Sequence, residues 1–303
     1  MKTDLDHLPE TKKRELARIV EILFAEFEAA IAGGTMPYKR KGAILKIILF
    51  GSYARGDWVA DPIGGYISDY DLLVVVNDDK LTDITDYWSK AEDHLLREYG
   101  ISHRLTAPAS FIVHSLNDVN QQLRVGRYFF TDIVRDGIVL YELEGHTFAQ
   151  PETLAPAEAL KEAQGYFDEW FESAGRFLQY GRDGIERGWS KEAAFNLHQA
   201  TERLYHCVLL VVTLYSPKSH KLNFLRSQAE QLDPRLAEAW PRATKFEQRC
   251  FELLRRAYVD ARYSPHYKIS AEDLAWLGER VTVLQELVKT VCEERLLMLR
   301  IES

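Results

Sequence analysis

Apolar positions in the first half of the chain follow two different periods. Near the N-terminus they recur every three or four residues, the spacing of one helix face, and Gly33 and Gly34 end the pattern. The residues of this face are Leu16, Ile19, Val20, Leu23 and Phe27. Short runs of aliphatic and β-branched residues at 44–50, 71–76 and 109–114 predict buried strands. A helical period predicts a helix over 81–99, and the apolar residues of 126–142 are interpreted as core. This half is therefore expected to mix helices and strands.

The second half has the helical period throughout. It predicts helices over 158–180, 190–215, 219–232, 242–262 and 271–297, which suits an antiparallel bundle. Glycines and prolines mark the expected breaks: Gly181, Gly184, Gly188, Pro217, Pro234, Pro241 and Pro265. The segment 146–159 has two prolines and neither period. We therefore place one domain at 1–146 and a second at 157–303.

Composition narrows the class of protein. The chain has 303 residues, 46% of them hydrophobic, and a net charge of −8, which suits a globular protein and argues against a binder of nucleic acid over its whole surface. Its longest apolar stretch, Cys207–Tyr215, is far shorter than a membrane span, and the N-terminus has no secretory pattern. Cys207, Cys250 and Cys292 are too dispersed for a disulfide framework or a zinc site. We expect a cytoplasmic protein without a membrane partner.

Candidate chemistry lies between the first two predicted strands. Gly51 and Ser52 follow a strand and precede a polar segment able to start a helix, a turn whose free N–H groups and hydroxyl can hold phosphate. Asp69 and Asp71 stand two apart at the start of the next strand, so their side chains share a face. Two neighbouring carboxylates repel unless a cation lies between them, and Mg²⁺ is the natural candidate. Each feature alone also fits an ordinary turn or a solvated loop.

Together, the segments GSYARGD and SDYDLLVVV resemble the nucleotidyltransferases of the DNA polymerase β superfamily, in particular the minimal nucleotidyltransferases of bacteria. The resemblance implies an α+β domain with a mixed sheet. It implies that Gly51 and Ser52 hold the β- and γ-phosphates of a nucleoside triphosphate, and that Asp69 and Asp71 bind two Mg²⁺ ions. Arg55 would lie near the phosphates or form an ion pair with Asp57.

Two departures from the family affect this interpretation. The stretch around 58–66 is longer than usual, and the third carboxylate that the family carries on a later strand is missing from ASFIVHSLNDVN. His114 occupies the plausible position at the end of that strand and is our candidate for a neutral proton acceptor. Asp118 is the nearest acid and is expected to cap the next helix or to face solvent. Loss of the third carboxylate would weaken or abolish catalysis, whereas the domain could still bind nucleotide.

The helical half, with AFNLHQATERLYHCVLLVVTLY followed by SHKLNFL, resembles a HEPN domain, an all-α bundle often fused to such nucleotidyltransferases. Many HEPN proteins are ribonucleases in which four to six residues lie between an Arg and a His, one more at least than here. Here Arg262 and His266 are separated by three residues, and Pro265 disfavours a continuous helix. We therefore expect weak or no cleavage of RNA. Tyr267, beside His266, and Tyr263 are possible acceptors of a nucleotide, by analogy with paired toxin–antitoxin systems.

Three functions remain open at this point. The first is a Mg²⁺-dependent transfer of a nucleoside monophosphate, AMP being the expected one, to a hydroxyl of protein, RNA or a small molecule. The second is a HEPN ribonuclease regulated by its nucleotidyltransferase domain, and the third is a degenerate nucleotide-binding module. We also expect a homodimer through the helical half, because that half has wide apolar faces. The apolar residues that suggested it are Val208, Leu209, Val211 and Val212.

Overall fold

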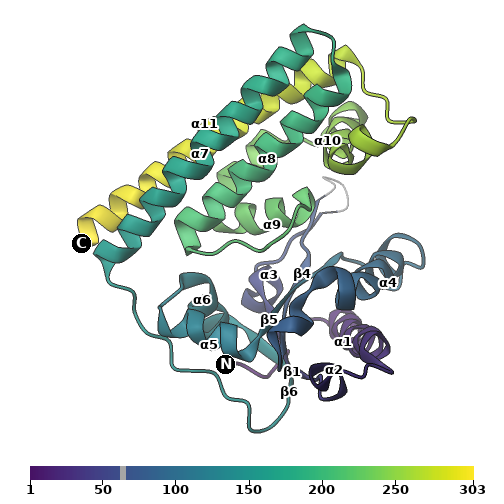
Figure 1. Ribbon diagram of the computed structural model, residues 1–303, viewed down its shortest axis with the longest axis vertical. Coiled ribbons are helices and arrows are strands. Elements are labelled where there is room, and N and C mark those ends of the chain that lie inside the picture. The colour runs from purple at the N-terminus through teal and green to yellow at the C-terminus, as the bar shows by residue number, and fades with distance from the viewer. Residues whose placement is uncertain (62–65) are drawn as a thin grey trace. The chain divides into compact units, whose positions relative to one another are not determined.

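The computed structural model describes residues 1–61 and 66–303, which form two compact units, Met1–Thr153 and Leu154–Ser303 (Figure 1). Helices of the first unit are α1 (Glu10–Ile31), α2 (Pro37–Arg40), α3 (Gly51–Arg55), α4 (Ser89–Gly100), α5 (Leu116–Arg124) and α6 (Tyr128–Asp136), with short helical turns η1 (Asp79–Thr82) and η2 (Ile84–Trp88). Its strands are β1 (Ile44–Phe50), β2 (Ala60–Asp61), β3 (Tyr66–Ile67), β4 (Tyr70–Val76), β5 (Ala109–Ser115) and β6 (Ile138–Glu142).

The main sheet of the first unit is mixed, as the family resemblance implied. Its strand order is β5-β4-β1-β6; β1 runs antiparallel to β4 and β6, whereas β4 and β5 are parallel. Every residue of β1 and β4 is buried, which explains why both strands are continuous apolar runs rather than alternating ones. The pair β2–β3 is a separate two-stranded ribbon.

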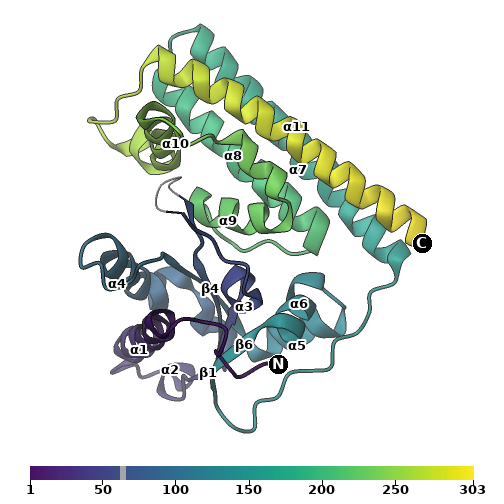
Figure 2. The same cartoon turned by 180° about the vertical axis from the view of Figure 1, so that it is seen from behind.

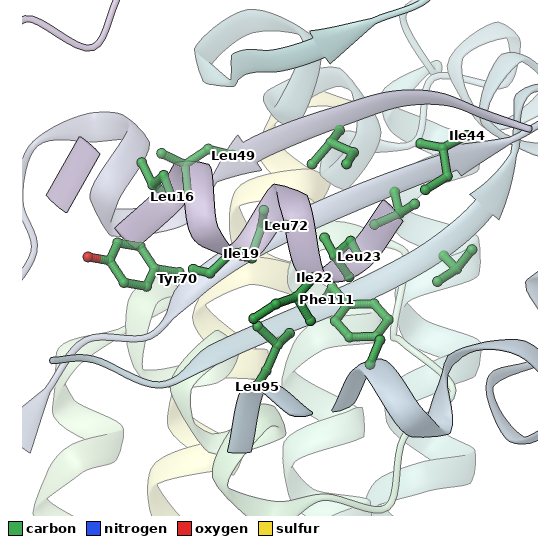
Figure 3. Packing of buried hydrophobic residues seen from close by; sticks show 14 of the residues in the cluster. Leu16, Ile19, Ile22, Leu23, Ile44, Leu49, Tyr70, Leu72, Leu95 and Phe111 are labelled. Atoms are coloured by element: carbon green, nitrogen blue, oxygen red, sulfur yellow. The ribbon is translucent and has the colours of Figure 1, made fainter. Parts of the chain in front are cut away.

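Helices cover both faces of this sheet (Figures 1 and 2). The apolar face of α1 packs, together with α4, on one side of the sheet, where Leu16, Ile19 and Leu23 meet side chains of β1, β4 and β5 (Figure 3). On the other side, Phe129 and Phe130 of α6 contact Phe50 and His114 edge to face. Because side chains alternate along a strand, Tyr70 and Leu72 face α1, and Asp71 points to the opposite side.

One expectation for the first unit needs correction, and another was incomplete. The segment 81–99 is not one helix: η1, a π-helical turn and α4 follow one another, with Asp78 and Asp83 capping the first two. The apolar residues of 126–142 belong to the core as expected, since Phe130, Ile133 and Ile138 are buried, and the region forms α6 and the edge strand β6. Its pairing with β1 joins positions about ninety residues apart, which no local pattern reveals.

The second unit is built of helices α7 (Pro156–Glu186), α8 (Ser190–Thr213), α9 (Leu222–Leu232), α10 (Lys245–Tyr263) and α11 (Ala271–Glu302), with the turn η3 (Pro234–Ala239). The long helices α7, α8 and α11 lie side by side (Figures 1 and 2). Val208, Leu209 and Val211, which suggested a dimer face, are buried inside this unit. None of the described helices is both long and apolar enough to cross a membrane.

The predicted breaks at Gly181 and Gly184 are wrong, because α7 continues through both. A Cβ at Gly181 would lie 2.8 Å from a methyl group of Leu197, and one at Gly184 would lie 3.1 Å from the Cβ of Ala193. These glycines therefore let α7 and α8 approach closely. Gly188, with a φ of +71°, follows the end of the helix as expected.

Candidate functional site

The pairing of β1 with β4 places the candidates for phosphate binding, Gly51 and Ser52, close to the candidates for metal binding, Asp69 and Asp71. Phe50 lies opposite Asp71 in the antiparallel ladder. Gly51 and Ser52 directly follow Phe50, and Asp69 directly precedes β4, so all four candidate residues lie at one edge of the sheet. Gly51 has a φ of +72°, a left-handed conformation that favours glycine at the sharp change from strand to helix.

The hydroxyl of Ser52 is buried in this turn without a partner in the described part of the chain. Ser52 is 5% exposed, and its Oγ has no hydrogen-bond partner among the described residues. A buried hydroxyl without a partner costs free energy, so native structures rarely retain one without a reason. A phosphate oxygen at this turn would accept that hydrogen bond.

Asp71 is completely buried and Asp69 is half-buried. Burial of carboxylates is unfavourable unless a cation or hydrogen-bond donors compensate their charge. Across 1–61 and 66–303, no group of three or more His, Cys, Asp or Glu side chains is placed to hold a metal. Two carboxylates nevertheless fit Mg²⁺, which keeps several waters and takes other ligands from substrate phosphates.

Tyr70, between the two aspartates, anchors this edge of the sheet to α1. Its phenol donates a 2.8 Å hydrogen bond to Glu15, a buried residue that also accepts from the backbone and hydroxyl of Thr106. Tyr53, beside Ser52, stacks on Tyr70 with ring centroids 4.2 Å apart. Burial, followed by the neighbouring Glu15, raises the pKa of both phenols, which keeps them neutral. Tyr53 and Tyr70 thus connect the turn and the aspartates to the core.

Arg55 is exposed and donates from Nε to Asp57 at 3.2 Å, which is the ion pair expected as the alternative to a phosphate contact. Trp58 stacks on Tyr53. The remainder of the long stretch 58–66 falls partly on residues 62–65, which lie outside the described residues.

His114 does not belong to this edge of the sheet, contrary to our expectation. In the parallel register of β4 and β5 it lies level with Val75, four residues beyond Asp71. At a rise of about 3.3 Å per residue, that is about 13 Å along the strand. His114 instead hydrogen-bonds Asp118, which lies in the first turn of α5, and packs on Phe130.

Ser110 is the residue of β5 that lies level with Asp71. Partners in a parallel ladder share a face, so Ser110 and not His114 occupies the place nearest the buried aspartate. Sequence reasoning missed it, because it searched for an acid or a base near the end of the strand. The register shows that the start of β5 was the relevant position.

The three candidates of the helical unit differ in exposure and in their place relative to α10. Arg262 lies in the last turn of α10, which ends at Tyr263, so His266 lies beyond the helix end as predicted. Arg262 and His266 are both exposed. Tyr267 is 5% exposed and donates its hydroxyl to the backbone of Leu253, whereas Tyr263 is 74% exposed. Tyr263 is therefore the accessible hydroxyl of this segment.

Comparison with known proteins finds a different family in each of the two compact units. Residues 37–123 match the family model described as polymerase beta, nucleotidyltransferase, and residues 167–291 match the HEPN domain. Over 103 residues the chain is 35% identical to a protein of Methanocaldococcus jannaschii described as "Putative protein adenylyltransferase". That match spans 34% of this chain and 84% of the archaeal protein. The chain therefore belongs to the nucleotidyltransferases of the polymerase β superfamily, with a HEPN domain fused at the C-terminal side.

Proposed function

We propose that this nucleotidyltransferase transfers AMP from ATP to a hydroxyl group and depends on Mg²⁺. The observation that carries the proposal is the edge of the sheet where the unpartnered Ser52 hydroxyl and the left-handed turn at Gly51 meet Asp69 and Asp71. The adenylyl group is supported by the description of the archaeal relative as a protein adenylyltransferase.

In the proposed reaction, the acceptor oxygen forms a bond to the α-phosphorus of ATP. The bond from that phosphorus to the oxygen bridging the α- and β-phosphates breaks, pyrophosphate leaves, and the hydroxyl proton is released. Gly51 and Ser52 would hold the leaving phosphates, and Asp69 and Asp71 would hold Mg²⁺. Bound Mg²⁺ supplies stabilisation of the negative charge that develops on the phosphate oxygens.

A protein hydroxyl is the acceptor that the relative's description favours, and a tyrosine of the HEPN domain is one such group. Of the two tyrosines that flank His266, Tyr263 has the accessible phenol. Tyr267 would have to break its bond to the Leu253 carbonyl and leave the core before it could react. The HEPN domain would in this way supply the acceptor.

The test compares wild type with Asp69→Asn and Asp71→Asn, which keep the side-chain shape and remove the charge. Binding of ATP is measured by calorimetry with and without Mg²⁺, and transfer is followed with ATP labelled at the α- or the γ-phosphate. We expect Mg²⁺-dependent binding and transfer of the α-label in wild type, and loss of both in the two variants. Asp93→Asn, an exposed aspartate of α4, is the matched control and should behave as wild type.

Three results would contradict the proposal. If wild type and the double variant Asp69→Asn, Asp71→Asn bound Mg²⁺–ATP equally well, these aspartates would not form the metal site. Transfer of the γ-label and not the α-label would indicate a phosphoryl transferase. Binding of Mg²⁺–ATP by wild type without transfer to protein, RNA or an amino alcohol would indicate a degenerate nucleotide-binding module.

A further inference from the structure

A histidine near the N-terminus is bonded to α3, the short helix that begins at the turn of Gly51 and Ser52. Nε2 of His7 lies 2.8 Å from the carbonyl oxygen of Tyr53, 46 positions further along the chain. A carbonyl oxygen only accepts hydrogen bonds, so Nε2 carries a proton and donates it. His7 lies outside residues 37–123, the part of the chain that matches the nucleotidyltransferase family. The bond therefore ties the candidate site to a segment that the family match does not include.

Helix α3 needs such a contact because it is only five residues long. A helix of that length is not stable by itself, and the carbonyls of its last turn have no partners within the helix. The amides of the two residues that follow α3 both donate to the carbonyl of Ser52, at 2.9 and 3.1 Å. His7 supplies a hydrogen bond to the next carbonyl, that of Tyr53. A distant segment thus completes the end of the helix that carries the turn.

The imidazole ring of His7 also packs on the chain that leaves α3. It meets Trp58 edge to face, with 6.3 Å between the ring centroids, and a Cβ at Gly56 would lie 3.5 Å from its Cδ2. Trp58 in turn stacks on Tyr53, with centroids 5.4 Å apart and 10° between the planes. His7, Tyr53 and Trp58 therefore contact one another in a closed cycle, which fixes the direction of the donated hydrogen bond.

The segment that carries His7 is itself held on both sides. Before it, the amide of Lys2 donates to the carbonyl of Gly137 at 3.2 Å, and the amide of Val139 donates to the carbonyl of Lys2 at 2.9 Å. After it, Leu8 is 3% exposed and belongs to the core of the first unit. His7 is thus in place before any nucleotide arrives, so little entropy is lost in ordering it on binding.

We propose that His7 is a positioning residue of the nucleotide site. By holding the carbonyl of Tyr53 it fixes α3, and with it the turn at Gly51 and Ser52, in the orientation that receives the phosphates of ATP. This inference rests on the proposed function. Because His7 acts on the turn and not on the reacting phosphorus, it stabilises bound ATP and the transition state equally. Loss of its bond should therefore raise KM for ATP and leave kcat unchanged.

The experiment uses two substitutions of His7 in the full chain. His7→Phe keeps a ring beside Trp58 and removes the donor, whereas His7→Gln can keep a donor at the place of Nε2. His103→Phe is the matched control, because His103 is also exposed and bonds a helix carbonyl, that of Tyr99 in α4, at 3.0 Å. Calorimetry measures the affinity for Mg²⁺–ATP, and steady-state kinetics of transfer give kcat and KM. Urea unfolding shows whether each variant is folded and how stable it is.

We expect His7→Phe to bind Mg²⁺–ATP about three- to tenfold more weakly than wild type, as the loss of one hydrogen bond implies. KM for ATP should rise by the same factor at unchanged kcat. His7→Gln, which keeps the donor, should restore the wild-type affinity. His103→Phe should bind as wild type does, even where it loses as much stability as His7→Phe.

Wild-type affinity in His7→Phe would overturn this inference alone, and so would a loss that His7→Gln does not restore. An equal loss of affinity in His103→Phe would also overturn it, because the effect would then follow general stability and not the turn. If wild type bound Mg²⁺–ATP without transferring AMP, the proposed function would fail while calorimetry still tested His7. Absence of Mg²⁺–ATP binding by wild type would overturn the proposed function and this inference together.

Discussion

The buried hydroxyl of Ser52 allows stability and ligand binding to be changed in opposite directions. Ser52→Ala removes a polar atom that has no partner in the described structure. We expect the free energy of unfolding to stay unchanged or to rise by about 1 kcal/mol, because a buried unsatisfied hydroxyl is lost. Affinity for Mg²⁺–ATP should fall tenfold or more, because a hydrogen bond to a charged group is worth about 1.5–3 kcal/mol. Urea unfolding and calorimetry measure the two quantities.

Ser52→Thr, which keeps the hydroxyl, serves as the comparison for that variant. If Ser52→Ala destabilised the protein by several kcal/mol, Oγ would have a structural partner. If the variant kept full affinity for Mg²⁺–ATP, the turn would not contact the phosphates.

Ser110 stands level with the buried Asp71, where an added carboxylate would complete a set of three acids. We expect Ser110→Asp to lower stability without metal, because like charges repel at close range, and to bind Mg²⁺ more tightly than wild type. Thermal unfolding with and without Mg²⁺ measures both effects. Ser110→Asn, of similar shape and without charge, should show neither. If Mg²⁺ did not change the stability of Ser110→Asp, Ser110 would not lie beside the metal.

Among the elements, helix α8 carries two buried histidines that make the stability of the helical unit depend on pH. Burial lowers the pKa of His198 to about 3 and that of His206 to about 4, below the value of an exposed histidine. In the unfolded chain both side chains take up a proton near pH 6.5, so below that pH the unfolded state binds more protons than the folded state. The helical unit should therefore lose stability as the pH falls from 6.5 towards 4, and show no such dependence above pH 7.5.

Linkage gives a loss of about 2 kcal/mol for each of these histidines between pH 7 and pH 5. Urea unfolding at a series of pH values measures the slope. A variant with His198→Leu and His206→Gln should show a shallower slope over this range. An unchanged slope in that variant would assign the acid sensitivity to other groups.

Strands β1 and β4 show what local pattern could predict. The buried apolar runs at 44–50 and 71–76 became β1 and β4, and the pairing of these strands brings the predicted residues Gly51, Ser52, Asp69 and Asp71 to one edge of the sheet. What local pattern could not supply was register. His114 and Ser110 lie four residues apart on β5, and only the pairing with β4 shows which of them lies beside Asp71.

Glycines in α7 illustrate a second limit of prediction from sequence. Gly181 and Gly184 were interpreted as breaks because glycine destabilises a helix interior by up to about 1 kcal/mol. Tertiary packing outweighs this cost, since only glycine lets α8 approach α7 so closely at these two positions.

At the scale of the whole molecule, the expected homodimer needs a different surface from the one first considered. Val208, Leu209 and Val211 belong to the core of the helical unit. Leu297, Met298 and Ile301, near the end of α11, are instead 55–77% exposed. We still expect a dimer through the helical unit, and light scattering at micromolar concentration should give twice the mass of one chain. A particle with the mass of a single chain would contradict this.

The nucleotidyltransferase unit should also fold without the helical unit. The members of its main core cluster all lie between Leu8 and Ile138, and a unit of this size can bury a sufficient core. The archaeal relative supports this: a match of 103 residues covers 84% of its length, so that protein is shorter than residues 1–153. We predict that a fragment of residues 1–153 unfolds cooperatively and binds ATP in the presence of Mg²⁺ with the affinity of the full chain.

Near-ultraviolet circular dichroism and calorimetry test this prediction on the fragments 1–153 and 154–303. Loss of the near-ultraviolet signal in 1–153 would show that its core needs the second unit. A folded fragment that no longer bound Mg²⁺–ATP would show that residues of the helical unit complete the nucleotide site. Retention of ATP binding by the folded fragment 1–153 would show that the nucleotide site needs no residue of the helical unit.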